Sequence, residues 1–142
     1  PLVWAMIEGE TESGVTLFRL EDGVDDGDII KQGKISIEPN DTIKEVYDKA
    51  TVASKAILSE VLTANEVNFS PQDKSKIEIY PQRSPTDGEI DWNWPAVRIQ
   101  NFIRAQTRPY PGAWTIINDK KVTIWDASIE DRSRQRKTNI KI

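Results

Sequence analysis

Apolar residues recur every three to four positions along residues 41–63, the longest regular pattern in the chain. This period places them on one face of an amphipathic α-helix. Asp41 or Thr42 can accept hydrogen bonds from the free amides of the first turn, and Thr42 with Glu45 forms a capping-box pattern. We expect the helix to pack on a sheet through its apolar residues, which are Ile43, Val46, Tyr47, Ala50, Ala53, Ile57, Leu58 and Val61.

Shorter elements precede this helix. Residues 1–9 combine a proline at the start, apolar residues inside and a glycine at the end, which predicts a short helix. Residues 14–20 and 29–37 predict two strands, the second of them broken at Gly33. Because a natural amino terminus is usually polar and frayed, the apolar start leads us to expect further residues before Pro1.

The periodicity is interrupted at residues 65–75 by polar side chains and Pro71, and we place a subdomain boundary there. Beyond this boundary the sequence predicts a short strand at 77–80, a turn-rich loop at 83–88 and a helix at 95–105. The second half of the chain therefore begins with short elements and long connections.

The last part of the chain has the pattern of a β-hairpin, with strands at 113–117 and 122–126 and a turn at Asn118-Asp119. Short strands with one small helix indicate a compact barrel-like unit. The basic segment at 132–141 is weakly patterned, so we expect the barrel to lack its final strands. In the turn before the hairpin, the Tyr110-Pro111 bond is a candidate for the cis form, since a proline follows an aromatic residue.

Charge and composition narrow the chemistry. Of the 142 residues 30% are charged and the formal net charge is −4, which favours a soluble cytoplasmic protein without a broad cationic surface for nucleic acid. No apolar run approaches the roughly 20 residues that span a bilayer. The sequence has no cysteine and no histidine, so disulfides, a thiol nucleophile, a Ser-His dyad and histidine-ligated zinc are excluded within it.

An acidic loop at residues 21–28 lies between the two predicted strands and places five carboxylates within eight residues. One interpretation is a solvated turn in which Gly23 and Gly27 take positive φ and the aspartates accept from backbone amides. A second is a calcium or magnesium site, although the spacing lacks the EF-hand pattern and its closing glutamate. A third is catalytic, since ligands bind at strand-end loops of α/β domains and a buried carboxylate can polarise a catalytic base.

The surroundings of this loop favour the catalytic interpretation. A series of motifs runs in order along residues 1–128: Trp4-Ala5-Met6-Ile7-Glu8-Gly9-Glu10, Gly14-Val15-Thr16-Leu17, Gly23-Val24-Asp25-Asp26-Gly27-Asp28-Ile29-Ile30, Gln32, Asp41-Thr42, Pro71-Gln72-Asp73, Arg83-Ser84-Pro85, Ile90-Asp91-Trp92, Ile103-Arg104-Ala105 and Pro109-Tyr110-Pro111-Gly112-Ala113-Trp114. In this order they resemble the 10-formyltetrahydrofolate-dependent formyltransferases. That family includes methionyl-tRNA formyltransferase and the amino-sugar N-formyltransferases.

The resemblance implies a defined chemistry. Formyl transfer to an amine passes through a tetrahedral oxyanion, so the site needs a base for the amine proton and a donor for the developing charge. The family uses an asparagine for the oxyanion, a histidine for the proton and an aspartate that raises the pKa of this histidine. The aspartate corresponds to Asp25, whereas the other two belong to a motif upstream of Pro1 that this sequence does not contain. We therefore expect the chain alone to be inactive.

The same resemblance assigns a donor pocket to the acidic loop. In the family this loop lines the pocket of the formyl donor 10-formyltetrahydrofolate, partly through backbone groups. The corresponding residues here are Glu21, Asp22, Gly23, Val24 and Asp25. The turn at 109–114 either packs its aromatic rings rigidly or shapes the substrate side of the cleft between the subdomains. We expect Trp92, Trp94 and Trp125 to be core or interface aromatics rather than base-stacking platforms.

Together these features predict an α/β fold: the later part of a Rossmann-like formyltransferase domain at 1–66, then a small OB-like β subdomain at 67–142. We expect the intact protein to transfer a formyl group from 10-formyltetrahydrofolate to the primary amine of a nucleotide-linked amino sugar. The motifs Asp87-Gly88-Glu89-Ile90-Asp91-Trp92 and Arg108-Pro109-Tyr110-Pro111-Gly112 look closer to the sugar enzymes, and the acidic net charge gives a tRNA backbone little to bind.

Several alternatives stay open from the sequence. The acceptor is a tRNA if the protein is a methionyl-tRNA formyltransferase, and the chain is a non-catalytic binding fragment if its OB-like unit serves only interaction. A metal-dependent hydrolase built on the acidic loop is a third alternative. A homodimer is compatible with the sequence.

Overall fold

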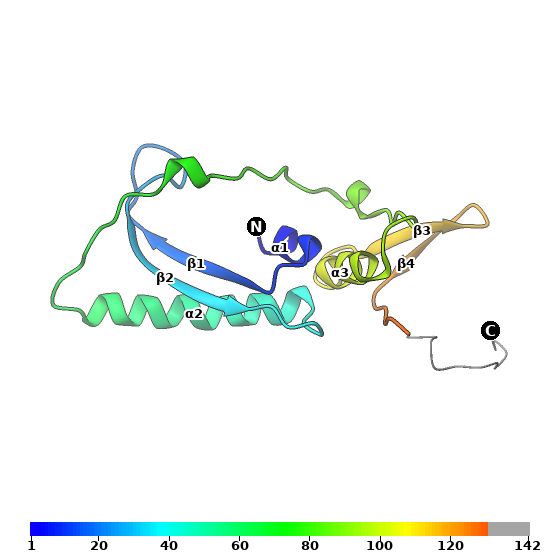
Figure 1. Ribbon diagram of the computed structural model, residues 1–142, viewed down its shortest axis with the longest axis horizontal. Helices are drawn as coiled ribbons and strands as arrows, with labels where there is room; N and C mark the ends of the chain where they lie inside the picture. Colours follow the sequence, from blue (N-terminus) through cyan, green and yellow to red (C-terminus); the bar gives the residue numbers. More distant parts are fainter. Residues whose placement is uncertain (131–142) are drawn as a thin grey trace.

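The computed structural model describes residues 1–130 of the chain, in which helices and strands are mixed as the α/β prediction requires (Figure 1). Its elements are α1 (Leu2–Glu8), β1 (Glu12–Phe18), β2 (Ile29–Ser36), α2 (Ile43–Thr63), the 3₁₀ turns η1 (Lys74–Lys76) and η2 (Pro85–Gly88), α3 (Ala96–Gln106), β3 (Ala113–Ile117) and β4 (Lys120–Ile124). Figure 1 shows α2 running along the β1–β2 ribbon, with α1 near α3 and the β3–β4 hairpin at the other end of the molecule. Within these described residues, no helix is both long and apolar enough to cross a membrane.

The two strands β1 and β2 form an antiparallel ribbon. The predicted break at Gly33 is wrong, because Gly33 lies opposite Val15 within the continuous strand β2. A Cβ atom at this glycine would lie 3.1 Å from Cγ2 of Ile57, so the small residue permits the close approach of the ribbon to α2. The irregularity in the ladder falls instead between Leu17 and Phe18.

The helix α2 begins as predicted. The Thr42 hydroxyl accepts from the backbone N–H of Lys44 at 3.3 Å, and the Glu45 carboxylate accepts from the N–H of Thr42 at 2.9 Å, which confirms the capping box. The buried members of the predicted stripe are Ile43, Val46, Ala50 and Ile57. Tyr47 and Leu58 are 39% and 46% exposed, so the buried stripe is narrower than predicted.

One apolar core joins the first and second halves of the chain. Its largest fully buried side chains are Met6 of α1, Ile43 and Val46 of α2 and Ile103 of α3. Complete burial of an aliphatic side chain contributes about 1.5–3 kcal/mol each. The helix of the second half thus packs directly on the helices of the first, and the boundary placed at residue 66 stays a prediction.

The β3–β4 hairpin confirms the predicted hairpin and its turn. Asn118 and Asp119 have φ of 49° and 59°, the left-handed values that a two-residue type I′ turn requires. The second strand starts at Lys120, two residues before its predicted start at 122. A closed OB-like barrel stays a prediction, and the segment 132–141 lies outside the described residues.

Two further expectations about local geometry are wrong. Residues 77–80 form no strand, and Ile79 in this segment is 90% exposed, because no described strand lies beside it to pair with. The cis peptide bond lies at Arg108-Pro109 rather than at Tyr110-Pro111. The turn that contains it closes through a hydrogen bond from the Gly112 N–H to the Gln106 carbonyl oxygen at 3.0 Å.

The buried carboxylate of Asp41 and the guanidinium of Arg104 hold the turn before α2, and Arg104 joins this turn to α3. The carboxylate of Asp41, a residue only 9% exposed, accepts from the backbone N–H of Glu38 at 2.7 Å and pairs with Nζ of Lys49 at 2.5 Å. From α3, Arg104 donates to the carbonyl oxygens of Glu38 and Asp41 at 3.0 and 2.9 Å. Burial by itself raises the pKa of Asp41, but the hydrogen bonds from Lys49 and Glu38 outweigh it, so the pKa lies below its usual value.

We expect Asp41→Asn to lower the free energy of unfolding by about 1–3 kcal/mol at neutral pH, because the amide cannot pair with the Lys49 charge. Since the pKa of Asp41 is depressed in the folded state, this contribution is present above 3.8, the ordinary pKa of an aspartate, and is lost as the pH falls through the lower folded value. Urea unfolding over a pH series measures both effects. The gap between wild type and variant should therefore close in acid.

A matched control is Asp48→Asn, which removes an exposed ion pair with Lys44 in the same helix. Its expected cost is below about 0.5 kcal/mol. Equal losses in the two variants, or a gap that does not shrink in acid, would contradict the assigned role of Asp41.

Candidate active site

The acidic loop at residues 21–28 connects β1 to β2 and lies at one end of the ribbon (Figure 1). Its base is closed by a hydrogen bond from the Arg19 N–H to the Asp28 carbonyl oxygen at 2.9 Å, and Arg19 also pairs with Glu21 at 3.2 Å. Residues 21–26 are all exposed, and the apolar side chain of Val24 is 92% exposed. The loop therefore presents both carboxylates and an apolar surface to the outside of the described structure.

The backbone of this loop differs from the glycine-based turn considered from the sequence. The left-handed residue is Asp25, with φ of 54°, whereas neither Gly23 nor Gly27 takes positive φ. Aspartate is one of the few side chains that tolerate this region, because its short polar group bonds locally. Gly27 is needed for space: a Cβ there would lie 1.7 Å from the carbonyl oxygen of Arg19.

A residue from the connection after α2 contacts this loop, and sequence reasoning assigned no role to it. The side-chain amide of Gln72 donates to the carbonyl oxygens of Asp25 at 2.8 Å and Gly27 at 2.7 Å. Two residues earlier, the backbone of Ser70 exchanges hydrogen bonds with Ile29 at 2.7 and 2.9 Å. The signal in the sequence was the motif Pro71-Gln72-Asp73, but its contact partner lies more than forty residues away in the chain.

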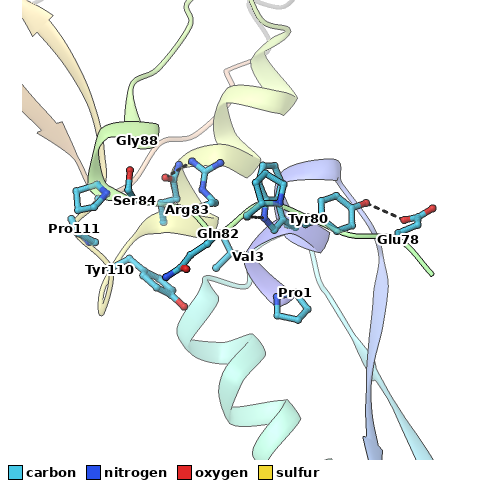
Figure 2. Close-up of a pocket in the computed structure, with 15 residues that line it drawn as sticks. Pro1, Val3, Glu78, Tyr80, Gln82, Arg83, Ser84, Gly88, Tyr110 and Pro111 are labelled. Carbon is cyan, nitrogen blue, oxygen red and sulfur yellow. Dashed lines mark hydrogen bonds between the residues drawn. The ribbon is translucent and has the colours of Figure 1, made fainter. Parts of the chain in front are cut away.

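A second feature is a cavity of about 660 Å³ beside the start of α1. Figure 2 shows its wall formed by residues of α1, the connection around residues 78–88 and the turn before β3. Its lining residues are Pro1, Val3, Trp4, Glu78, Tyr80, Pro81, Gln82, Arg83, Ser84, Pro85, Gly88, Gln106, Tyr110, Pro111 and Gly112. The turn at 109–114, considered from the sequence as one wall of a substrate cleft, thus contributes three of them.

The cation of this cavity is Arg83. Its guanidinium lies over the rings of Trp4 and Phe102, at 4.9 and 5.3 Å from their centroids. One nitrogen, Nη2, donates to the Asp87 carbonyl oxygen at 2.5 Å and to Oε1 of Gln106 at 2.8 Å. Burial lowers the pKa of Arg83, which stays cationic at neutral pH because arginine titrates far above it. The cavity therefore contains a rigidly held positive charge between aromatic faces.

A pair of tyrosines links the cavity to α2. The hydroxyl groups of Tyr47 and Tyr110 lie 2.5 Å apart, one from α2 and the other from the turn before β3. Partial burial, followed by this hydrogen bond, raises the pKa of Tyr47 to about 12. The Tyr47 hydroxyl is thus protonated at neutral pH, and the hydrogen-bonded pair fixes one wall of the cavity.

The acidic loop and the cavity are separate places in the described structure, since no residue of 21–28 lines the cavity. They share one connection: the segment 70–83 contacts the loop through Gln72 and lines the cavity from Glu78 onward. Near the cavity, the Pro81 carbonyl oxygen accepts from Nε1 of Trp4 at 3.0 Å. Residues 1–130 contain no group of three or more carboxylates, histidines or cysteines placed to hold a metal ion.

Comparison with known proteins defines the class of protein. The family model described as formyl transferase matches residues 1–62, and the model described as formyl transferase, C-terminal domain, matches residues 83–140. The chain belongs to the formyltransferase family.

Three individual proteins are similar to this chain over most of its length. The chain is 41% identical over 136 residues to the bifunctional polymyxin resistance protein ArnA of Wigglesworthia glossinidia brevipalpis, covering 94% of this chain and 21% of that protein. The methionyl-tRNA formyltransferase of Clostridium thermocellum is similar in fold, with a TM-score of 0.79 at 20% identity over 92% of this chain and 56% of that chain. WlaRD, a sugar 3N-formyl transferase, matches with a TM-score of 0.69 at 27% identity over 84% of this chain and 45% of that chain. The chain thus spans about half the length of these solved relatives and about a fifth of the curated one.

We expect Gly27→Ala to destabilise the chain by about 1–3 kcal/mol, because the new methyl group overlaps the Arg19 carbonyl oxygen and forces the loop to move. The matched control is Gly23→Ala, where the Cβ meets only the flexible side chain of Asp26. Its expected effect is within about 0.5 kcal/mol. Urea unfolding of both variants checks the difference, and equal stability of the two would show that the loop does not close against Arg19.

Proposed function

We propose that the protein containing this chain transfers a formyl group from 10-formyltetrahydrofolate to a primary amine, and that this chain supplies the aspartate of the catalytic group. The observation that carries the proposal is the match of both formyltransferase models, in order, to the two halves of one fold. The exposed acidic loop at a strand end, where α/β domains bind ligands, supports the same function.

The donor pocket, in this proposal, is lined by Glu21, Asp22, Gly23, Val24 and Asp25. Their exposure fits this role, since the backbone of the loop and the apolar face of Val24 are free to meet a flat ring. A left-handed residue at the tip turns successive peptide groups in different directions, which suits recognition through backbone groups. WlaRD, at 27% identity, was crystallised in the presence of dTDP and 5-N-formyl-THF, which supports a folate donor for this family member.

The chemical role proposed for Asp25 follows from the negative charge of its carboxylate. Attack of an amine on the formyl carbon forms a tetrahedral oxyanion and leaves a proton to be removed from nitrogen. A carboxylate hydrogen-bonded to an imidazole favours the imidazolium form and so raises the pKa of the base. The sequence has no histidine, so in this proposal the base and the oxyanion donor come from outside residues 1–142.

The acceptor in this proposal is a nucleotide-linked amino sugar, and the cavity at Arg83 is its binding site. The volume of about 660 Å³ is in the range of small-molecule sites. The positive charge of the Arg83 guanidinium attracts a phosphate group, to which its Nη1 can donate while Nη2 stays bonded to Asp87 and Gln106. The rings of Trp4 and Tyr80 provide apolar faces. The net charge of −4 weakens the case for tRNA, because phosphate-backbone binding depends on many cations. We place the reaction in the cytoplasm.

We expect Asp25→Asn, made in the intact protein, to lower kcat by about 10²–10⁴-fold while the formyl donor still binds. Asparagine tolerates the left-handed conformation as aspartate does, so the variant changes the charge and leaves the backbone in place. Steady-state kinetics and donor binding by fluorescence titration measure the two effects. The neighbouring Asp26→Asn is the control and should turn over at the wild-type rate; unchanged turnover in Asp25→Asn would show that Asp25 is only a turn residue.

We expect Arg83→Lys to raise KM for a nucleotide-linked amino sugar about tenfold with KM for the donor unchanged, because lysine keeps the charge but not the planar, stacked fork. Arg98→Lys is the matched control, since Arg98 also lies over a tryptophan, Trp94, but does not line the cavity. Equal effects on both substrates would argue for a general loss of structure. Tight, salt-sensitive binding of tRNA by the intact protein would overturn the choice of a sugar acceptor.

A further inference from the structure

The acidic loop is held from outside by the connection that follows α2. The side-chain nitrogen of Gln72 donates to the carbonyl oxygens of Asp25 at 2.8 Å and Gly27 at 2.7 Å. Both hydrogens of one primary amide are thus used on two carbonyl groups that flank a single residue. The bond to Gly27 is partly buried and so shielded in part from competing water, whereas the bond to Asp25 is exposed.

These bonds hold a backbone conformation that few contacts within the loop itself stabilise. Asp25 has φ of 54°, a region that L-residues rarely occupy unless surrounding contacts fix it. The hydrogen bond between Arg19 and Asp28 closes the loop at its base, and residues 21–26 above it are exposed. The Gln72 amide contacts the carbonyl group of the left-handed residue itself, where a change of conformation would break the bond.

The anchoring of Gln72 is itself firm. Ser70 exchanges two backbone hydrogen bonds with Ile29, at 2.7 and 2.9 Å, so the connection is fixed to the first residue of β2. Gln72 follows two residues later and reaches the loop from a backbone that the ribbon already holds in place. The backbone that carries the donor is therefore pre-positioned, and little backbone freedom is lost on forming the two bonds.

We propose that Gln72 is a positioning residue for the candidate catalytic acid: its amide fixes the loop in the conformation in which Asp25 acts. This inference rests on the proposed function for its catalytic consequence, and on geometry alone for the holding of the loop. The same segment, residues 70–83, runs on to line the cavity at Arg83, and the Trp4 ring nitrogen donates to Pro81 within it. Gln72 thereby fixes the loop to the segment that forms the acceptor wall.

Two variants of the intact protein separate the hydrogen bonds from the shape of the side chain. Gln72→Glu presents a carboxylate to both carbonyl oxygens, and Gln72→Met keeps the length of the side chain without a donor. We expect hydrogen–deuterium exchange of the Arg19 amide, which donates to the Asp28 carbonyl oxygen at the base of the loop, to rise at least about tenfold in both variants. We expect kcat/KM to fall about ten- to a hundredfold, as misplacement of a reacting group predicts. The melting temperature should stay close to that of the wild type.

The pH dependence provides a further test. Relative to wild type at each pH, Gln72→Glu should regain activity in mild acid, because a protonated carboxyl group donates one hydrogen bond, whereas Gln72→Met should not. Gln32→Glu is the matched control: Gln32 is exposed on β2 and donates to Thr16, away from the loop, so exchange and kinetics should match the wild type.

The outcomes distinguish this inference from the proposed function. Unchanged exchange of the Arg19 amide in both Gln72 variants would overturn the inference, whatever the kinetics. Increased exchange with wild-type kcat/KM, while Asp25→Asn is inactive, would overturn the positioning role. If Asp25→Asn is fully active, the catalytic assignment of Asp25 fails instead, and the catalytic consequence proposed for Gln72 fails with it.

Discussion

The buried contact between α1 and α3 holds the first and second halves of the chain together. Met6 and Ile103 are almost without solvent exposure, and the core around them also takes in the start of α2. Arg104 reinforces this contact by donating to the carbonyl oxygens of Glu38 and Asp41, in a turn that Lys49 also holds through its ion pair. Because helices from both halves share this core, the long connection between them has fixed ends.

Because its ends are fixed, this connection can support both the acidic loop and the wall of the cavity. At its start it is paired with β2 and contacts the acidic loop, and farther on it forms the wall of the cavity beside α1. The two surfaces that this connection contacts carry opposite charge. Carboxylates gather on the acidic loop, and the guanidinium of Arg83 lies between aromatic rings in the cavity. A donor and an acceptor of different chemistry would each find a suitable surface, joined by one stretch of chain.

Local patterns predicted much of the fold correctly, and their failures have a common cause. The capping box at Thr42 and the turn at Asn118-Asp119 follow from the chemistry of a few adjacent residues, so the sequence alone predicts them. The sequence pattern predicts a break at Gly33, but the role of this glycine depends on Ile57 of the helix beside it. The segment 77–80 has strand-like residues, yet a strand forms only where a partner lies next to it.

At the candidate site, the residue types and the family can be read from the sequence: an acidic loop with Asp25 in register with formyltransferase motifs, and no histidine. The way the loop is built depends on contacts that form only in the folded chain. The tertiary structure places the positive φ at Asp25, makes Gly27 necessary through the approach of the Arg19 carbonyl group, and brings Gln72 to the loop from across the chain. Hydrogen bonds between residues far apart in sequence leave no periodic pattern, and the conformation of an exposed loop depends on such contacts.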